Sequence, residues 1–268
     1  MNDRGLFRKS LLGLGLAFLY IPILSMIVYS FNASRLATVW GGFSTKWYAT
    51  LLSNAQVGKA LWLSLEIALL SSTIATILGT MAGIALARFT KFRGRTLFSG
   101  LVTAPLVMPE VITGISSLIF FILMAQYVGW PSSRGFTTVT LAHITFSMVF
   151  VTTIVQSRML SADRAIEEAA MDLGESRWSA FRLVTLPLVM PGIISSLLIA
   201  FTISLDEFII AFFLTGANPT MPVYIWGLLR FPGSLPIVMA LGTILVGLSI
   251  ILLTIAEILR RRGMARAG

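Results

Sequence analysis

Long apolar stretches alternate with short polar or charged segments along this 268-residue sequence. A helix of about 20 apolar residues crosses the roughly 30 Å hydrocarbon core of a bilayer, because each residue adds about 1.5 Å. Each stretch of that length therefore predicts a membrane-spanning helix, and six occur, at residues 11–31, 61–86, 97–125, 136–157, 189–214 and 237–259. We predict an all-α polytopic membrane protein with a single membrane domain over residues 1–268.

The composition excludes a soluble enzyme and a disordered chain. Hydrophobic residues make up 56% of the sequence and charged residues 12%, and the mean hydropathy is +0.89. A soluble globular domain is about one quarter charged. The first uncharged run, at residues 10–34, is longer than the roughly 7–15 apolar residues of a secretory signal, so we expect it to remain as an uncleaved span.

Lys and Arg are distributed unequally between the two sides of the predicted spans. One set of polar segments carries 15 of the 20 Lys and Arg residues, and the opposite set carries only Arg35, Lys46, Lys59, Arg134 and Arg230. Cytoplasmic loops retain Lys and Arg, so we expect the richer side, which holds both termini and the longest loop (158–188), to be cytoplasmic. The net charge of +9 then lies at the membrane surface, which indicates contact with lipid rather than with nucleic acid.

The chain lacks the residues for metal or nucleotide chemistry of its own. It has no Cys and one His, so we expect neither a disulfide framework nor a metal site. A P-loop requires Gly-x4-Gly-Lys-Ser/Thr. The only Gly-Lys pair, Gly58-Lys59, has Ser53 in place of the first Gly and Ala60 in place of the hydroxyl residue. We expect no cofactor in this chain, with any ATP and Mg bound by a partner.

The long loop at 158–188 contains an amphipathic pattern. Small and apolar residues recur at helical spacing from Ala162 to Leu173, and Asp163, Arg164, Glu167 and Glu168 occupy the opposite, polar face. Ser161 or Asp163 is the predicted N-cap, and Gly174 is the predicted left-handed C-terminal cap. A second helical segment is predicted over 176–185, before Pro187 begins the next span.

The same loop carries a motif of spaced residues. They read Glu168-Ala169-Ala170, three residues, Gly174, nine residues, then Val184-x-Leu186-Pro187. This pattern resembles the hallmark of the permease subunits of binding-protein-dependent (type I) ABC importers, in which Ile stands where this chain has Val184. The resemblance implies a type I ABC importer permease fold, in which this loop is a coupling helix that docks into a separate ATPase subunit.

Five acidic residues fall within or at the edges of the predicted spans: Glu66, Glu110, Asp206, Glu207 and Glu257. An ionisable residue inside a membrane costs roughly 2.5–3.5 kcal/mol on insertion scales, so each suggests a function or a specific partner. Glu257 is predicted to pair with Arg261 one turn later, and Glu66 to pair with Lys59 or to extend to the membrane surface. His143 is predicted to be a hydrogen-bonded packing residue.

The remaining three acids are candidates for a substrate pathway. Glu110 follows Pro105 and Pro109, which free backbone carbonyls that must be buried in protein or face water. Asp206 and Glu207 are adjacent, so on a helix their side chains point about 100° apart. Uncompensated carboxylates favour a cation, although hydrogen bonding between helices by protonated carboxyls is the alternative.

The segments 107–114 and 204–207, together with the loop motif, are similar to polyamine permeases, particularly the putrescine type. The resemblance implies one of two permease subunits in a bacterial cytoplasmic membrane, which import putrescine or spermidine with an ATPase pair and a periplasmic binding protein. The alternatives are the same machinery for ferric iron, thiamine or another solute, and a stand-alone ion-coupled transporter or channel. The sequence disfavours a third alternative, a membrane-embedded enzyme, because the chain has no Cys, no paired His and no metal-binding cluster.

Overall fold

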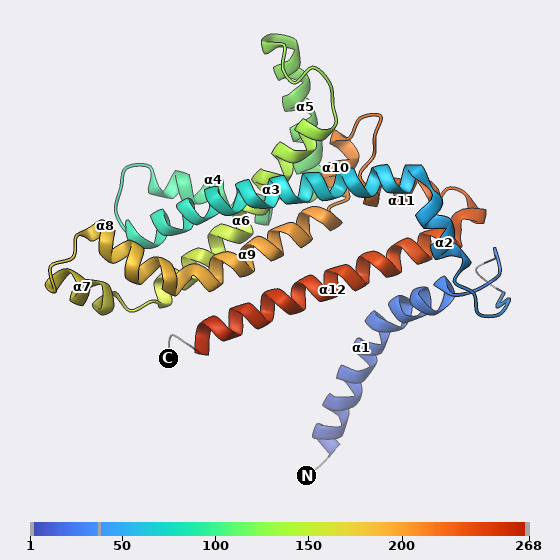
Figure 1. Cartoon of the computed structure of the whole chain (residues 1–268), viewed down its shortest axis with the longest axis horizontal. Helices are drawn as coiled ribbons and strands as arrows, with labels where there is room; N and C mark the ends of the chain where they lie inside the picture. The colour runs from blue at the N-terminus through green and yellow to red at the C-terminus, as the bar shows by residue number, and fades with distance from the viewer. Residues whose placement is uncertain (1–2, 37–38, 266–268) are drawn as a thin grey trace. The chain divides into compact units, whose positions relative to one another are not determined.

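The computed structural model describes residues 3–36 and 39–265 (Figure 1). Over these residues the regular structure is helical, apart from one isolated antiparallel bridge between Asn32 and Phe43, which confirms the all-α prediction. The elements are α1 (Asp3–Ser30), α2 (Lys46–Ser53), α3 (Ala55–Arg88), α4 (Arg95–Val107), α5 (Glu110–Val128), α6 (Phe136–Ser161), α7 (Arg164–Asp172), α8 (Arg177–Ala180), the π-helix η1 (Phe181–Thr185), α9 (Leu186–Asp206), α10 (Ile209–Leu214), α11 (Met221–Leu228), the 3₁₀ turn η2 (Pro232–Ser234) and α12 (Leu235–Ala265).

Six of the described helical segments are long and apolar enough to cross a membrane, which confirms the predicted number. They are Phe7–Ser30, Ala55–Arg88, Glu110–Val128, Phe136–Ser161, Arg177–Asp206 and Pro232–Ile258. The chain is therefore a multi-pass membrane protein. The predicted cytoplasmic position of both termini stays a prediction, and residues 1–2 and 266–268, including Arg266, lie outside the described residues.

The third predicted span, 97–125, is wrong as one continuous helix. The chain forms α4 and then α5, separated by Met108 and Pro109, with Met108 extended at φ −78° and ψ 133°. Proline disfavours the helical conformation in the residue before it and has no N–H to donate, so the helix stops there. The 13 residues of α4 are too few to cross the bilayer, and α5 forms the third span.

The fifth predicted span, 189–214, is also interrupted. The helix begins earlier, at Arg177, and continues through α8, η1 and α9 as far as Asp206. Within it, η1 has a wide turn in which the Leu186 N–H donates to the Phe181 carbonyl. Pro187 follows directly and cannot donate, which explains a local departure from α-helical bonding. Glu207 is extended, at ψ 114°, and α10 begins at Ile209, three residues after Asp206.

Contacts within the chain group it into two compact units, Met1–Gly58 with Tyr224–Leu248 and Lys59–Val223 with Ser249–Gly268. The single membrane domain therefore stays a prediction. In the first unit, Asn32 organises the turn after α1: its side chain donates to the Val39 carbonyl at 2.8 Å and accepts from the Gly41 N–H at 2.7 Å. The backbone carbonyl of Asn32 accepts from the Trp47 indole N–H at 2.7 Å.

The second unit is built around α6, which packs closely against α3 and α9 (Figure 1). Gly79 and Gly83 of α3 make this approach possible, since a Cβ on Gly79 would lie 2.7 Å from the Val151 side chain, and one on Gly83 would lie 2.9 Å from the Thr152 carbonyl. Small residues at such spacing are the usual means of close helix packing in membranes. A cluster of buried apolar side chains also joins α3, α5, α6 and α10.

Candidate functional site

The predicted motif helix of the long loop is α7, and its two ends are set by local capping. Asp163 is the N-cap, since its carboxylate accepts from the Ala165 N–H at 2.9 Å. Ser161 instead donates to the Arg158 carbonyl at 3.0 Å, so of the two predicted caps only Asp163 is confirmed.

Gly174 ends α7 in the left-handed conformation that the sequence predicts, at φ +97°. Its N–H donates to the Met171 carbonyl at 3.0 Å, and the Glu175 N–H donates to the Ala170 carbonyl at 3.2 Å. These two bonds form a Schellman motif, which turns the chain sharply and favours glycine at this position. Ser176 then begins the next helix by accepting from the Ser179 N–H at 3.1 Å.

The loop presents apolar side chains that the chain itself does not cover. Leu173 is 88% exposed, Trp178 71% and Leu183 62%. In the motif, Glu168 and Ala169 are exposed, and Ala170 is partly buried. Trp178 and Leu183 belong to the fifth span, whereas Leu173 and the motif residues precede it, so the exposed apolar Leu173 with the charged Glu168 is what favours contact with another protein.

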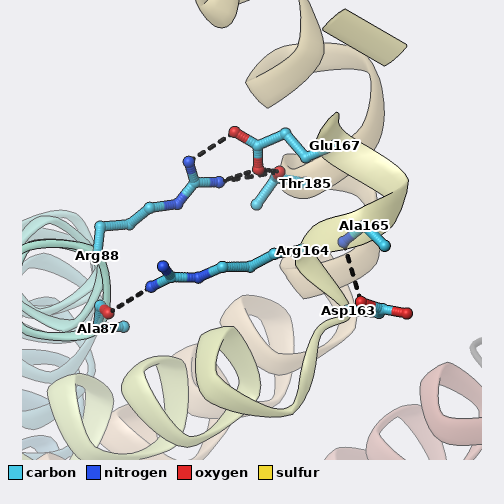
Figure 2. A network of polar contacts seen from close by, with 7 residues as sticks. All are labelled: Ala87, Arg88, Asp163, Arg164, Ala165, Glu167 and Thr185. Carbon is cyan, nitrogen blue, oxygen red and sulfur yellow. Dashed lines mark hydrogen bonds and ion pairs between the residues drawn. The ribbon is translucent and has the colours of Figure 1, made fainter. Parts of the chain in front are cut away.

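One polar network attaches α7 to the end of α3 and to η1 (Figure 2). Arg88, the last residue of α3, donates from Nη1 to Glu167 Oε1 at 2.6 Å, and its Nη2 pairs with Glu167 Oε2. The Thr185 hydroxyl accepts from Arg88 Nη2 at 3.1 Å and donates to Glu167 Oε2. Arg164 of α7 donates to the Ala87 carbonyl at 3.2 Å.

This network lowers the pKa of the Glu167 carboxyl below its ordinary value, chiefly because Arg88 donates to the charged form. Sequence analysis places Glu167 on the polar face of the helix but gives it no partner. Arg88 and Thr185 lie 79 and 18 residues from it in the sequence, so no local pattern indicates the pairing.

The three predicted pathway acids do not form one cluster. Glu110 is the first residue of α5 and Glu207 lies in the break between α9 and α10, where its carboxyl accepts from the Ile210 N–H at 3.0 Å. The two carboxyls interact electrostatically. Close packing brings these breaks together, since a Cβ on Gly114 would lie 2.7 Å from the Phe213 ring.

Asp206 is the last residue of α9 and has a different partner from the extended Glu207. Its Oδ2 accepts from the Ser249 hydroxyl of α12 at 2.8 Å, and its side chain is exposed, whereas Glu207 is only 8% exposed. The structure therefore joins Glu110 to Glu207 and separates both from Asp206.

The other acids have local partners. Glu66 accepts from the Trp62 indole at 2.6 Å, and among the described residues no ion pair joins it to Lys59. Glu257 pairs with Arg261 at 2.6 Å, which confirms that prediction.

His143 is buried and bonded, as the sequence analysis predicts for a packing residue. Its Nδ1 and the Ser204 hydroxyl share a hydrogen bond of 2.8 Å, and Ser204 shares another of 2.8 Å with Ser71. This junction of α3, α6 and α9 lies one turn before the break at Glu207.

A cavity of about 620 Å³ lies between α5 and α6. Its lining is mostly apolar, with a few hydroxyls from Thr113, Ser116, Ser117 and Thr145. Glu110, Asp206 and Glu207 are not among its lining residues, so it does not unite the candidate acids.

The chain is similar to known transport proteins over nearly its whole length. It is 47% identical over 245 residues to "Putrescine transport system permease protein PotI" of Escherichia coli K12, covering 91% of this chain and 87% of the relative. It is 37% identical over 246 residues to "Spermidine/putrescine transport system permease protein PotC" of the same organism, covering 91% of this chain and 90% of the relative. These relatives make it a transporter subunit rather than an enzyme.

Solved structures share the fold. A bacterial ABC transporter that imports the acidic polysaccharide alginate matches 97% of this chain and 96% of its own, with a TM-score of 0.75 and 18% identity. The methionine ABC transporter MetNI in an inward-facing conformation matches 76% of this chain and 94% of its own, with a TM-score of 0.64 and 16% identity. The predicted ABC importer permease fold is thereby confirmed. Residues 79–263 match the family described as "Binding-protein-dependent transport system inner membrane component", and the chain belongs to that family.

Proposed function

We propose that this chain is one of two permease subunits of an ATP-driven importer that moves putrescine or spermidine across the bacterial cytoplasmic membrane. The observation that carries the proposal is α7, which presents the Glu-Ala-Ala motif and is followed directly by the exposed Leu173. The names of the two relatives support the polyamine substrate.

In this proposal α7 lies in the cytoplasm, together with both termini. The excess of Lys and Arg on that side of the spans supports the orientation. A separate pair of ATPase subunits binds ATP and Mg and receives α7, with Glu168 as a charged contact and Leu173 as an apolar contact.

The other partners complete the importer. A second permease, most simply a homologue of this chain, encloses the pathway, and a periplasmic substrate-binding protein docks on the opposite side. One of the similar solved structures is described as a transporter "in complex with alginate pentasaccharide-bound periplasmic protein", which supports docking of that kind.

Glu110 and Glu207 are the proposed cation contacts of the pathway. Both lie at helix breaks, Glu110 at the first residue of the third span and Glu207 just after the last residue of the fifth, and the charge of Glu110 acts on the Glu207 carboxyl. An amine placed between them would relieve that repulsion. Asp206 is a separate candidate on the side of α12.

The test is copurification of the cognate ATPase subunit with the chain carrying Glu168→Arg or Gly174→Val. We expect the subunit to be retained by the unaltered chain and by the control Glu66→Gln, and to be lost from both variants. Putrescine uptake by the purified chain alone, without a nucleotide-hydrolysing partner, would instead establish a stand-alone ion-coupled transporter.

The substrate is tested on the cognate periplasmic protein. We expect it to bind radiolabelled putrescine or spermidine, and binding of ferric iron or thiamine in place of both would replace the polyamine assignment.

A further inference from the structure

Arg88 lies where three segments of the chain meet. It ends α3, its guanidinium holds both carboxylate oxygens of Glu167 in α7, and Nη2 also reaches Thr185 in η1 at 3.1 Å (Figure 2). Its guanidinium carbon lies 5.7 Å from the centre of the Phe181 ring. A planar fork with two fixed donors resists rotation, which a single-point ion pair does not.

The same end of α3 is held by further arginines. Arg164 of α7 donates to the Ala87 carbonyl at 3.2 Å, and Arg95, the first residue of α4, donates to the Leu86 and Phe89 carbonyls at 3.3 and 3.2 Å. The last carbonyls of a helix have no partner within it and carry a partial negative charge, so cations are favoured there.

The network is sheltered rather than solvated. The Glu167 side chain is 12% exposed, the Arg88 side chain 28% and Thr185 only 4%. Two small hollows, of about 20 and 140 Å³, border the network, and Arg88 and Glu167 line both. Exposed ion pairs contribute little because water screens them, and this one is largely withdrawn from that screening.

We propose that Arg88, Glu167 and Thr185 form a link that transmits displacement of α7 to α3 and α9. The proposal rests on the proposed function, in which α7 docks on the ATPase. The exposed residues Glu168 and Leu173 contact the partner, and Glu167, whose side chain points about 100° away from that of Glu168, holds the helix to the spans. These three are positioning residues, because they act on substrate movement only through the helices they join.

The link predicts uncoupling rather than loss of assembly. With the link broken, α7 still seats on the ATPase and hydrolysis continues, but the movement reaches the spans less efficiently. The rival assignment is that Glu167 itself belongs to the docking surface, in which case its removal releases the ATPase subunit.

The experiment uses the full importer in proteoliposomes and measures three quantities: retained ATPase subunit, ATP hydrolysis, and uptake of radiolabelled putrescine per ATP hydrolysed. The variants are Glu167→Gln and Thr185→Val, which keep the side-chain shape, together with Arg88→Gln, Arg88→Lys and the double variant Arg88→Gln/Glu167→Gln. Arg93→Gln is the matched control, an exposed Arg on the same side of the spans.

We expect each single neutral variant to retain the subunit and its hydrolysis and to lower uptake per ATP about tenfold, a change within the range of coupling between groups in direct contact. The double variant should be no worse than either single one, Arg88→Lys should be intermediate, and Arg93→Gln unchanged. Should Arg88→Gln fail to fold, the shape-conserving Glu167→Gln and Thr185→Val decide the question.

Three results would overturn the link: unchanged uptake per ATP in Glu167→Gln and Thr185→Val, losses that multiply in the double variant, or release of the ATPase subunit by Glu167→Gln. These are distinct from failure of the proposed function, which would show as an unaltered chain that does not retain the ATPase subunit.

Discussion

Glu110 and Glu207 come from different spans, and the close packing of Gly114 against Phe213 brings together the two helix breaks that hold them. Each sits at an interruption of a helix, Glu110 just after Pro109 and Glu207 between α9 and α10. Two like charges brought near each other are unfavourable by themselves, and a cation bound between them would relieve that repulsion.

Neutralising either acid should slow transport without stopping the ATPase. We expect Glu110→Gln and Glu207→Gln to lower putrescine uptake about tenfold or more, because a hydrogen bond to a charged group contributes about 1.5–3 kcal/mol. Uptake and ATP hydrolysis by the assembled importer are the measurements, and Glu66→Gln is the matched control. Normal uptake in both variants would remove these residues from the pathway.

Gly174→Ala should weaken the end of α7. The residue has φ +97°, and a side chain there costs about 1–2 kcal/mol. We expect reduced hydrogen-exchange protection of the Gly174 and Glu175 amides and weaker retention of the ATPase subunit. Gly100→Ala, where an added Cβ meets open space, should change neither. Equal effects of the two substitutions would argue against the capping role.

The attachment of α7 should depend on pH in a defined direction. The pKa of Glu167 is lowered from its ordinary value of 4.5 by Arg88, so the folded state favours the charged carboxylate. The stabilisation is complete above that value and is lost as the pH falls through the lowered pKa. We expect the hydrogen-exchange protection of the α7 amides to fall between neutral and acid pH, and hydrogen exchange over that range measures it.

Glu167→Gln supplies the comparison for that titration. In this variant the acid-dependent loss of protection in α7 should disappear, and protection should already be low at neutral pH. A pH profile identical to that of the unaltered chain would show that other carboxyl groups cause the change.

The buried junction of His143, Ser204 and Ser71 should contribute to stability. Ser204→Ala removes one partner from each of the other two side chains, and we expect a loss of about 1–2 kcal/mol, the range seen for hydrogen bonds between helices in membranes. Thermal unfolding in detergent is the measurement. Ser72→Ala, which loses only a bond to the Leu69 carbonyl of its own helix, should cost less. A larger loss of stability in Ser72→Ala than in Ser204→Ala would contradict the contribution of the junction to stability.

Hydropathy alone predicts the number of spans, and short-range capping predicts both ends of α7. Crossing a bilayer requires a fixed length of apolar chain, and a cap requires only residues a few positions apart, such as Asp163 with Ala165 or Gly174 with Met171. Both depend on residues that are close together in the chain, so the sequence alone predicts them. Pro109 also predicts a break in the helix, but both sides of it are apolar, so hydropathy predicts one span where the structure has α4 and α5.

Which charged groups meet was decided by packing between distant segments. Gly114 lets α10 approach α5 and brings Glu207 towards Glu110, and the close packing of α3, α6 and α9 places Arg88 beside Glu167 and Thr185. A period of 3.6 residues assigns Glu167 to a polar face, but it does not say what that face meets. Partners far apart in the chain are chosen by the shapes of whole helices, and these exist only once the helices have packed.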